Sequence, residues 1–150
     1  MAQSFSRILV HLIFSTKHRE PLIDTEIRHR LHAYVSGIIR ESGGEALLVG
    51  GTADHVHALM TLPATRSISE MVRLIKANST KWIHETHPDH ADFGWQDGYA
   101  AFSVSESNVA KVAGYIAGQE LHHRKMLFQE EYLGFLRKHG VAVDERYVLD

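Results

Sequence analysis

Hydrophobic and polar positions along the chain follow two periods, one of two residues and one of three to four. Residues 6–16 carry β-branched, aromatic and other apolar side chains in both alternating sets, a pattern typical of a well-buried strand. Similar short runs cover residues 45–50, 55–62 and 99–104. The turn-forming segment 52–54 joins the second run to the third, so these two runs predict a β-hairpin.

Apolar residues that recur every three or four positions predict helices between these strands. Asp24 can cap a helix that continues to about Ser42. Ser67 and Glu70 form a capping box that opens a second long helix, and this helix ends before Pro88.

Two further helices are expected towards the C-terminus, one over about residues 106–123 and an amphipathic docking helix over 128–139. The elements before them follow the order strand-helix-strand-strand-helix-strand, which is that of the ferredoxin-like α+β fold. We therefore expect one antiparallel sheet layered with helices, in a single domain over residues 1–150. The core of this domain would cover about residues 6–125, followed by the last helix and a tail of mixed charge.

The composition narrows the class of protein. A chain of 150 residues with 44% apolar residues fits one domain with a real core. The absence of cysteine excludes disulfides, thiolate metal sites and cysteine nucleophiles. A net charge of −2 argues against binding nucleic acid by bulk charge, so DNA contacts must come from local patches. No apolar run approaches the ~20 residues of a membrane span, and no signal peptide is recognisable, so a cytoplasmic protein without a membrane partner is expected.

His55 and His57 are separated by one residue in a predicted strand, so their side chains project from the same face. Their Cα atoms should lie about 6.5–7 Å apart at ~3.3 Å per residue, which lets both imidazoles reach one ion. Two polar residues on a half-solvated strand would produce the same pattern. Two ligands are also an incomplete metal site, so a further ligand is needed from elsewhere in the chain.

Tyr115 and Gln119 lie four residues apart in the predicted third helix and so share one of its faces. They could complete the histidine site, although an ordinary polar helix surface would also explain them. Gly114 and Gly118 each cost a helix interior about 1 kcal/mol relative to alanine. These glycines predict either that something packs closely against this helix or that the helix moves.

These motifs resemble those of the single-tyrosine HUH transposases of bacterial insertion sequences, a family that includes the REP-associated tyrosine transposases. Residues 54–60 resemble the family's His-hydrophobic-His motif, and residues 115–119 resemble its Tyr-x-x-x-Gln helix. Residues 14–19 and 95–99 are similar to the end of its first strand and to the entry of its fourth. The resemblance covers roughly residues 6–125, with the four motifs in order.

The resemblance implies a ferredoxin-like, RRM-type fold, an obligate homodimer, and active sites that combine the histidine pair of one subunit with the tyrosine helix of the other. It implies a transposase in which Tyr115 attacks single-stranded or hairpin DNA, forms a 5′-phosphotyrosine and releases a 3′-hydroxyl. His55, His57 and the side-chain oxygen of Gln119 would hold a divalent metal ion. Two imidazoles and an amide oxygen with open positions suit Mg²⁺ or Mn²⁺ better than a closed tetrahedral zinc site.

Basic side chains outside these motifs could contact DNA phosphates. The candidates are Lys17, Arg19, Arg73, Lys76, Lys111, His122, Arg124 and Lys125. A solvated charged surface would account for them equally well. His11 is expected on the sheet face of the histidine pair, either as a group behind the metal ligands or as a buried core histidine.

Two other classes of function remain open at this point. The first is a non-catalytic or domesticated nucleic-acid-binding protein on the same fold, acting on palindromic repeats. The second is a metallohydrolase that activates water and forms no covalent adduct with DNA. Incubation with a labelled oligonucleotide separates the three, by an adduct, by cleavage without an adduct, or by binding alone.

Overall fold

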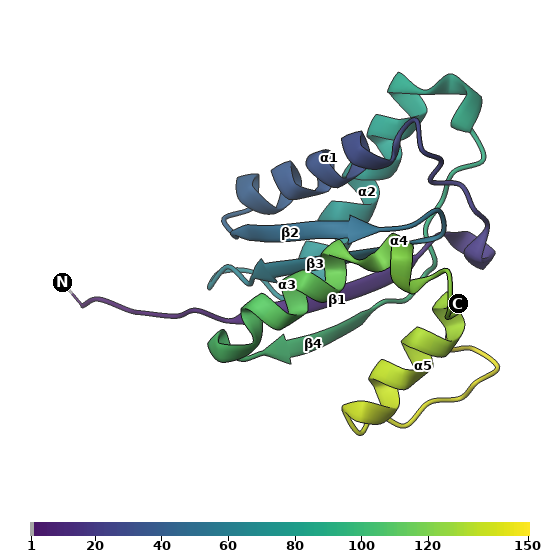
Figure 1. The fold of residues 1–150 in the computed structure, drawn as a ribbon. Coiled ribbons are helices and arrows are strands. Elements are labelled where there is room, and N and C mark those ends of the chain that lie inside the picture. The colour runs from purple at the N-terminus through teal and green to yellow at the C-terminus, as the bar shows by residue number, and fades with distance from the viewer. Residues whose placement is uncertain (1) are drawn as a thin grey trace.

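Four strands form one antiparallel sheet in the order β2-β3-β1-β4, which is the strand order of the ferredoxin-like fold (Figure 1). The structure is a computed structural model that describes residues 2–150. The strands are β1 (Leu9–Ser15), β2 (Ala46–Gly51), β3 (His55–Thr61) and β4 (Ala100–Val104). The predicted fold class is therefore confirmed, and β1 and β3 are the two central strands.

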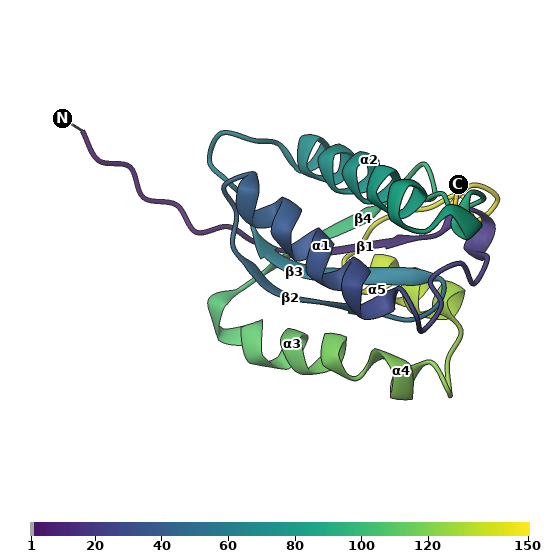
Figure 2. The same ribbon diagram turned by 90° about the horizontal axis from the view of Figure 1, so that it is seen from above.

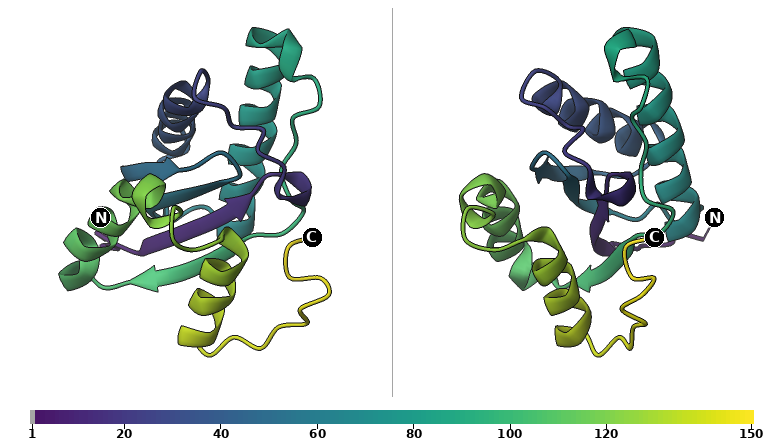
Figure 3. Two further views of the ribbon diagram at one scale, coloured as in Figure 1. Left: turned by 45° about the vertical axis from the view of Figure 1, so that its right-hand side comes forward. Right: turned by 90° about the vertical axis from the view of Figure 1, so that its right-hand side faces the viewer.

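The helices divide between the two faces of the sheet (Figures 2 and 3). One face is covered by α1 (Arg28–Glu41) and α2 (Ile68–Thr86). On the other face lie α3 (Val109–Ala117), α4 (Gln119–His122) and α5 (Phe128–Lys138). Short 3-10 turns are formed by Lys17–Arg19, Pro88–His90 and Glu106–Asn108. No helix within residues 2–150 has the length and apolar character needed to cross a membrane.

Local signals in the sequence place most helix ends. Asp24 Oδ1 accepts hydrogen bonds from the backbone N–H groups of Glu26 and Ile27, and regular helix begins shortly afterwards at Arg28. The Ser67 hydroxyl accepts a hydrogen bond from the Glu70 N–H at 3.2 Å, as the capping box predicts.

The predicted continuous helix over residues 106–123 is wrong in one respect. The chain forms a 3-10 turn first, and the helix is then interrupted at Gly118, where φ is −91° and ψ is 13°. Glycine is a weak helix former, so the interruption falls at the residue that opposes it least. The break separates α3, which carries Tyr115, from α4, which begins at Gln119.

The main hydrophobic core lies between the sheet and the α1–α2 layer. The central strand β1 sends Leu12 and Phe14 into this core, and both side chains are almost fully buried. Trp95, in the loop between α2 and β4, packs edge-on against Phe14 and donates its indole N–H to Ser79. A smaller cluster on the other face holds α5 against β1 and β4 through Phe128, Tyr132 and Leu136. Successive residues of a strand point to opposite faces of the sheet, so the residues of β1 and β3 that lie between those of the main core face α3, α4 and α5.

Helix α3 approaches the sheet most closely over Gly50 of β2. A Cβ atom at Gly50 would lie 2.9 Å from the Ile116 side chain and 3.0 Å from the Ile116 backbone oxygen. Within residues 2–150 no other element comes close to the helix glycines. A Cβ atom at Gly114 would meet nothing within 4 Å, and one at Gly118 would meet only the backbone oxygens of Gly114 and Tyr115, at 3.4 and 3.8 Å. The glycine that allows close packing thus belongs to the strand beneath the helix.

We expect Gly50→Ala to lower the free energy of unfolding by roughly 1–3 kcal/mol, because the added methyl group overpacks the contact with Ile116. Gly114→Ala is the matched control, and it should leave stability unchanged or raise it by up to about 1 kcal/mol through helix propensity. Urea denaturation of both variants measures the difference. Equal stabilities for the two variants would contradict this account of how α3 is seated.

Candidate active site

Strand β3 directs His55 and His57 towards the face covered by α3, α4 and α5. Both side chains are fully buried, and their ring centroids lie 5.1 Å apart. Full burial rules out the interpretation that they are polar residues on a half-solvated strand. A buried imidazole needs hydrogen-bond partners, so the neighbours of this pair determine what it can do.

Gln119 supplies the first of these neighbours. It is the first residue of α4, its side chain is buried, and its Oε1 lies 2.8 Å from His55 Nε2. The predicted association of Gln119 with the histidine pair therefore occurs in the structure. It occurs within one chain, so this contact does not require a second subunit.

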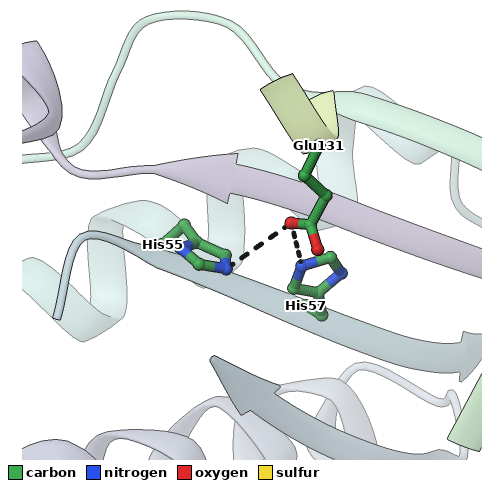
Figure 4. A group of neighbouring side chains, drawn as sticks. All are labelled: His55, His57 and Glu131. Atoms are coloured by element: carbon green, nitrogen blue, oxygen red, sulfur yellow. Dashed lines mark hydrogen bonds and ion pairs between the residues drawn. The ribbon is translucent and has the colours of Figure 1, made fainter. Parts of the chain in front are cut away.

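Glu131 is the functional-site residue that the sequence analysis missed. It projects from α5 between the two histidines (Figure 4). Its Oε1 lies 3.0 Å from His57 Nε2 and 3.7 Å from His55 Nε2. Its Oε2 accepts a hydrogen bond from Gln119 Nε2 at 3.1 Å. A signal was present in the sequence, because Glu131 lies three residues after Phe128 on the apolar face of this helix, where a carboxylate is out of place.

Tyr115 also reaches the cluster within the same chain. Its hydroxyl donates a hydrogen bond to Glu131 Oε2 and lies 3.1 Å from His122 Nε2. Burial and the nearby Glu131 carboxylate hold the pKa of Tyr115 well above its usual value. The phenol is therefore protonated near neutral pH in the metal-free chain.

Both histidines of β3 have partners on the side away from Gln119 and Glu131. His55 Nδ1 lies 2.7 Å from Asp54 Oδ1, and His57 Nδ1 lies 2.8 Å from His11 Nε2. His11 is thus both a buried histidine and a group that stands behind His57. Such partners set the orientation and tautomer of imidazoles that ligate metals.

The charge states of the buried groups suit a metal ion. Burial lowers the pKa of His57 to about 4 and that of His11 to about 3, so both rings are neutral near pH 7. Neutral imidazole is the form that binds metals. Burial alone would raise the pKa of Glu131, but contacts with His123 and His57 outweigh it and hold that pKa well below its usual value. The cluster therefore contains a carboxylate and neutral nitrogen donors.

The position of Gln119 also indicates a cation. Its amide N–H donates to Glu131, which leaves its oxygen facing His55. The imidazole of His55 donates its Nδ1 proton to Asp54, so its Nε2 lone pair points at that oxygen. Two acceptors that face one another at 2.8 Å need a cation between them, either a proton or a metal ion. The ligand atoms of His55, His57 and Glu131 all lie within 4.8 Å of one another, as a single ion requires.

The basic residues expected to contact DNA lie in three regions: around hollows beside α3 and α4, in the turn after β1, and on α2. Lys111 lines an open hollow beside Tyr115, and His122 and Lys125 line another on its far side. Arg124 lines a third hollow next to Asp54.

Lys17 and Arg19 are exposed just beyond the end of β1, where Ser15 pairs with His55. Arg73 and Lys76 lie on α2, across the sheet from Tyr115. The Lys76 ammonium donates to the backbone oxygens of Gln96 and Gly98 at 2.7 and 2.6 Å, and burial lowers its pKa to about 8. This lysine braces the loop before β4, and a contact of Lys76 with DNA stays a prediction.

The comparisons with known proteins agree with this fold. The family model described as "Transposase IS200 like" matches residues 4–119. The ISDra2 transposase TnpA of Deinococcus radiodurans is 26% identical over 114 residues, which cover 73% of this chain and 81% of that protein. The transposase for insertion sequence element IS200 of Salmonella typhimurium is also 26% identical, over 73% of this chain and 74% of the relative.

Two solved structures share the fold. A crystal structure from Deinococcus radiodurans R1, described as a transposase candidate, has a TM-score of 0.62 and 24% identity, and covers 79% of this chain and 98% of its own. A REP-associated tyrosine transposase bound to a REP hairpin has a TM-score of 0.59 and 16% identity, over 82% of this chain and 73% of that one.

The fold and the histidine–tyrosine cluster define an HUH-type nuclease of the single-tyrosine class, as the sequence resemblance predicts. The family model covers most of the chain, and the chain belongs to the IS200-like transposase family. It is accordingly a transposase, an enzyme that cuts and transfers DNA strands, and this family depends on a metal ion.

Acidification should destabilise the fold through His11. The pKa of His11 is about 3 in the folded chain against 6.5 in the unfolded chain, so the unfolded state binds more protons as the pH falls below 6.5. Between pH 7 and pH 5 this removes about 2 kcal/mol of stability. His11→Gln should reduce the measured loss between these two pH values by about that amount in urea denaturation. His29→Gln, at an exposed position of α1, is the control and should leave the loss intact; an unchanged loss in His11→Gln would refute the assignment.

Proposed function

We propose that this transposase cleaves and rejoins single-stranded DNA through a covalent 5′-phosphotyrosine on Tyr115, with a divalent ion held by His55, His57 and Gln119. The observation that carries the proposal is the convergence of Tyr115 and Gln119 on the buried histidine pair. One cluster thereby combines a nucleophile, neutral nitrogen donors and an amide oxygen.

In the proposed cleavage, the Tyr115 oxygen forms a bond to the phosphorus and the bond from phosphorus to the 3′-oxygen breaks. The 3′-oxygen leaves with a proton as a hydroxyl, and the 5′-phosphate stays on the tyrosine. Rejoining is the reverse, in which a 3′-hydroxyl attacks the phosphotyrosine, so the number of phosphodiester-type bonds is conserved and no ATP is needed.

The hydroxyl of Tyr115 needs activation before it can attack, because only about 0.1% of a free phenol with a pKa near 10 is ionised at neutral pH. Its proton points at Glu131 Oε2, and His122 Nε2 lies 3.1 Å from the same phenolic oxygen. Burial raises the pKa of Glu131, but contacts with His123 and His57 outweigh it and hold that pKa well below its usual value, so Glu131 is a poor base. His122 is therefore the group placed to accept the proton as the bond to phosphorus forms.

The bound ion would polarise the scissile phosphate and stabilise the charge that develops on it. We propose Mg²⁺ or Mn²⁺, because imidazole nitrogens, a side-chain amide oxygen and open positions suit these ions. The separation of 2.8 Å between His55 Nε2 and Gln119 Oε1 supports this, since two ligands at right angles on an ion with 2.0–2.1 Å bonds lie about 3 Å apart.

The proposed substrate is single-stranded or hairpin DNA. Lys111, His122 and Lys125 line the hollows on either side of Tyr115, where they can meet phosphates flanking the scissile bond. A similar fold in a REP-associated tyrosine transposase is seen with a REP hairpin bound.

A homodimer with shared active sites stays part of the proposal, as does action in the cytoplasm. The open space beside Gly114 leaves room for a second copy to approach α3. The contacts of Tyr115 and Gln119 with the histidine cluster are complete in one chain, so such a dimer would have to exchange these helices between subunits to share its sites.

Tyr115→Phe should abolish the covalent adduct and leave binding of the oligonucleotide within about twofold, because only the attacking oxygen is lost. A 5′- or 3′-labelled oligonucleotide carrying an imperfect palindrome, run on a denaturing gel with Mn²⁺, detects the adduct. Tyr147→Phe, at an exposed tyrosine outside the family motifs, is the control and should retain the adduct. A denaturant-resistant protein–DNA species with Tyr115→Phe would show that Tyr115 is not the nucleophile.

In the wild-type protein, cleavage without an adduct would indicate a metallohydrolase, and binding alone would indicate a non-catalytic protein.

His57→Ala should lose cleavage and Mn²⁺ binding together, because both depend on the same imidazole. Calorimetric titration with manganese chloride and a nicking assay measure the two properties on one preparation, and circular dichroism confirms that the variant is folded. His29→Ala provides the exposed-histidine control. Wild-type nicking by a folded His57→Ala variant would exclude the proposed site.

A further inference from the structure

Helix α5 contributes to the cluster from a part of the chain that the transposase family model does not reach. That model ends at residue 119, and Glu131 follows twelve residues later. The helix is held on the sheet by Phe128, Tyr132 and Leu136, and Glu131 belongs to the same buried face. A carboxylate costs several kcal/mol to bury without compensation, so its position must be accounted for by the groups around it.

The groups that face Glu131 include no permanently charged cation. Its ion-pair partners within residues 2–150 are all histidines: His55, His57, His122 and His123. No lysine or arginine of the described chain lies within ion-pair distance of its carboxylate. A neutral imidazole can donate a hydrogen bond to the carboxylate, but it cannot balance a full negative charge. Burial lowers the pKa of His123, but the hydrogen bond and the charge of Glu131 outweigh it and raise that pKa, so a proton on His123 is one source of balancing charge. A divalent cation at this point would supply the missing charge.

The two oxygens of the carboxylate have separate surroundings. Oε1 faces the nitrogens of the histidine pair, at 3.0 Å from His57 Nε2 and 3.7 Å from His55 Nε2. Oε2 faces the amide of Gln119 and the hydroxyl of Tyr115. Ligands at right angles on a six-coordinate ion with bonds of 2.0–2.1 Å lie about 3 Å apart, so Oε1 is placed as a ligand next to His57. Oε2 remains the acceptor of the hydrogen bond from the Tyr115 hydroxyl.

We propose that Glu131 is a protein ligand of the metal ion, so that the metal centre of this chain consists of His55, His57, Gln119 and Glu131 and is completed by α5. The inference builds on the proposed ion at the histidine pair and adds a charged ligand that the His-His-Gln set lacks. A carboxylate adds a hard oxygen ligand and a negative charge to the set of metal ligands, which favours Mg²⁺ and Mn²⁺ over metal ions that prefer softer ligands. Through Oε2 the same side chain is a positioning residue for Tyr115, which it holds beside the ion.

A second group of potential ligands competes for the same carboxylate. His122 and His123 of the α4 segment approach Glu131 at 3.3 and 3.1 Å. These two histidines are partly exposed, whereas His55 and His57 are fully buried and are oriented by Asp54 and His11. His55 and His57 are therefore better preorganised to bind a metal ion than His122 and His123. The experiment therefore has to locate the ion as well as detect it.

The test is titration of the purified full-length protein with manganese chloride in the absence of DNA, followed by calorimetry and by the electron paramagnetic resonance of free Mn²⁺. The wild-type chain should bind one Mn²⁺. Glu131→Gln keeps the size and hydrogen bonding of the side chain but removes its charge, and it should weaken binding by about tenfold or more. Glu130→Gln, the exposed neighbour on the same helix, is the matched control and should bind as the wild type does. Wild-type affinity in Glu131→Gln would overturn the proposal.

The double variant His122→Gln/His123→Gln locates the ion. Mn²⁺ binding should survive in this variant, and loss of binding would place the ion on α4 and overturn the assignment. Crystals of the wild-type protein soaked in manganese chloride give an answer that does not depend on the folding of any variant. The anomalous peak should lie within bonding distance of Glu131 Oε1 and of the histidine pair, and a peak bonded to the histidines but not to Glu131 would also overturn it. None of these measurements requires the covalent step, so failure of the Tyr115 mechanism and failure of the Glu131 assignment are distinguishable.

Discussion

The burial of polar side chains on one face of the sheet is the constraint on which the rest of the site depends. His55 and His57 have no exposed surface, and neither has appreciable access to water that could satisfy its nitrogens. Each ring is therefore held between two protein groups, His55 between Asp54 and Gln119, and His57 between His11 and Glu131. These contacts fix which ring nitrogen faces α4 and α5. They also connect the sheet to the three helices that bring Gln119, Tyr115 and Glu131.

One face of the sheet carries most of the hydrophobic core, and the other carries the side chains of the candidate active site. The side chains of β1 that face α1 and α2 are apolar and belong to the larger core, and β1 and β3 pair in continuous register. Their alternate neighbours include His11, which stands behind the site on the opposite face. The α1–α2 layer can thus remain rigid while α3, α4 and α5 carry the reacting groups. The break at Gly118 separates the tyrosine helix α3 from α4, and the space beside Gly114 is open.

Much of the fold followed from local patterns. The strand and helix order, the capping residues Asp24 and Ser67, and the hairpin that presents His55 all depend on interactions between residues near in sequence. A glycine in the sequence indicates close packing or a helix break, but it does not show which partner approaches. Here the close contact is made by Gly50 of the strand, and Gly118 acts by interrupting the helix.

The sequence by itself determined the order of strands and helices along the chain and the projection of His55 and His57 from one face of a strand, because both follow from backbone periods of two or 3.6 residues. Only the tertiary structure decided that the helix breaks at Gly118 and places Tyr115 on α3 and Gln119 on α4, and that both residues meet the histidine pair within one chain. It also decided that Lys76 turns inwards to backbone oxygens and that Glu131 enters between the histidines. Glu131 lies 74 residues after His57 along the chain, and its place beside the histidines depends on how α5 packs on the sheet. No local pattern contains that information, because it arises from the packing of apolar side chains far apart in the sequence.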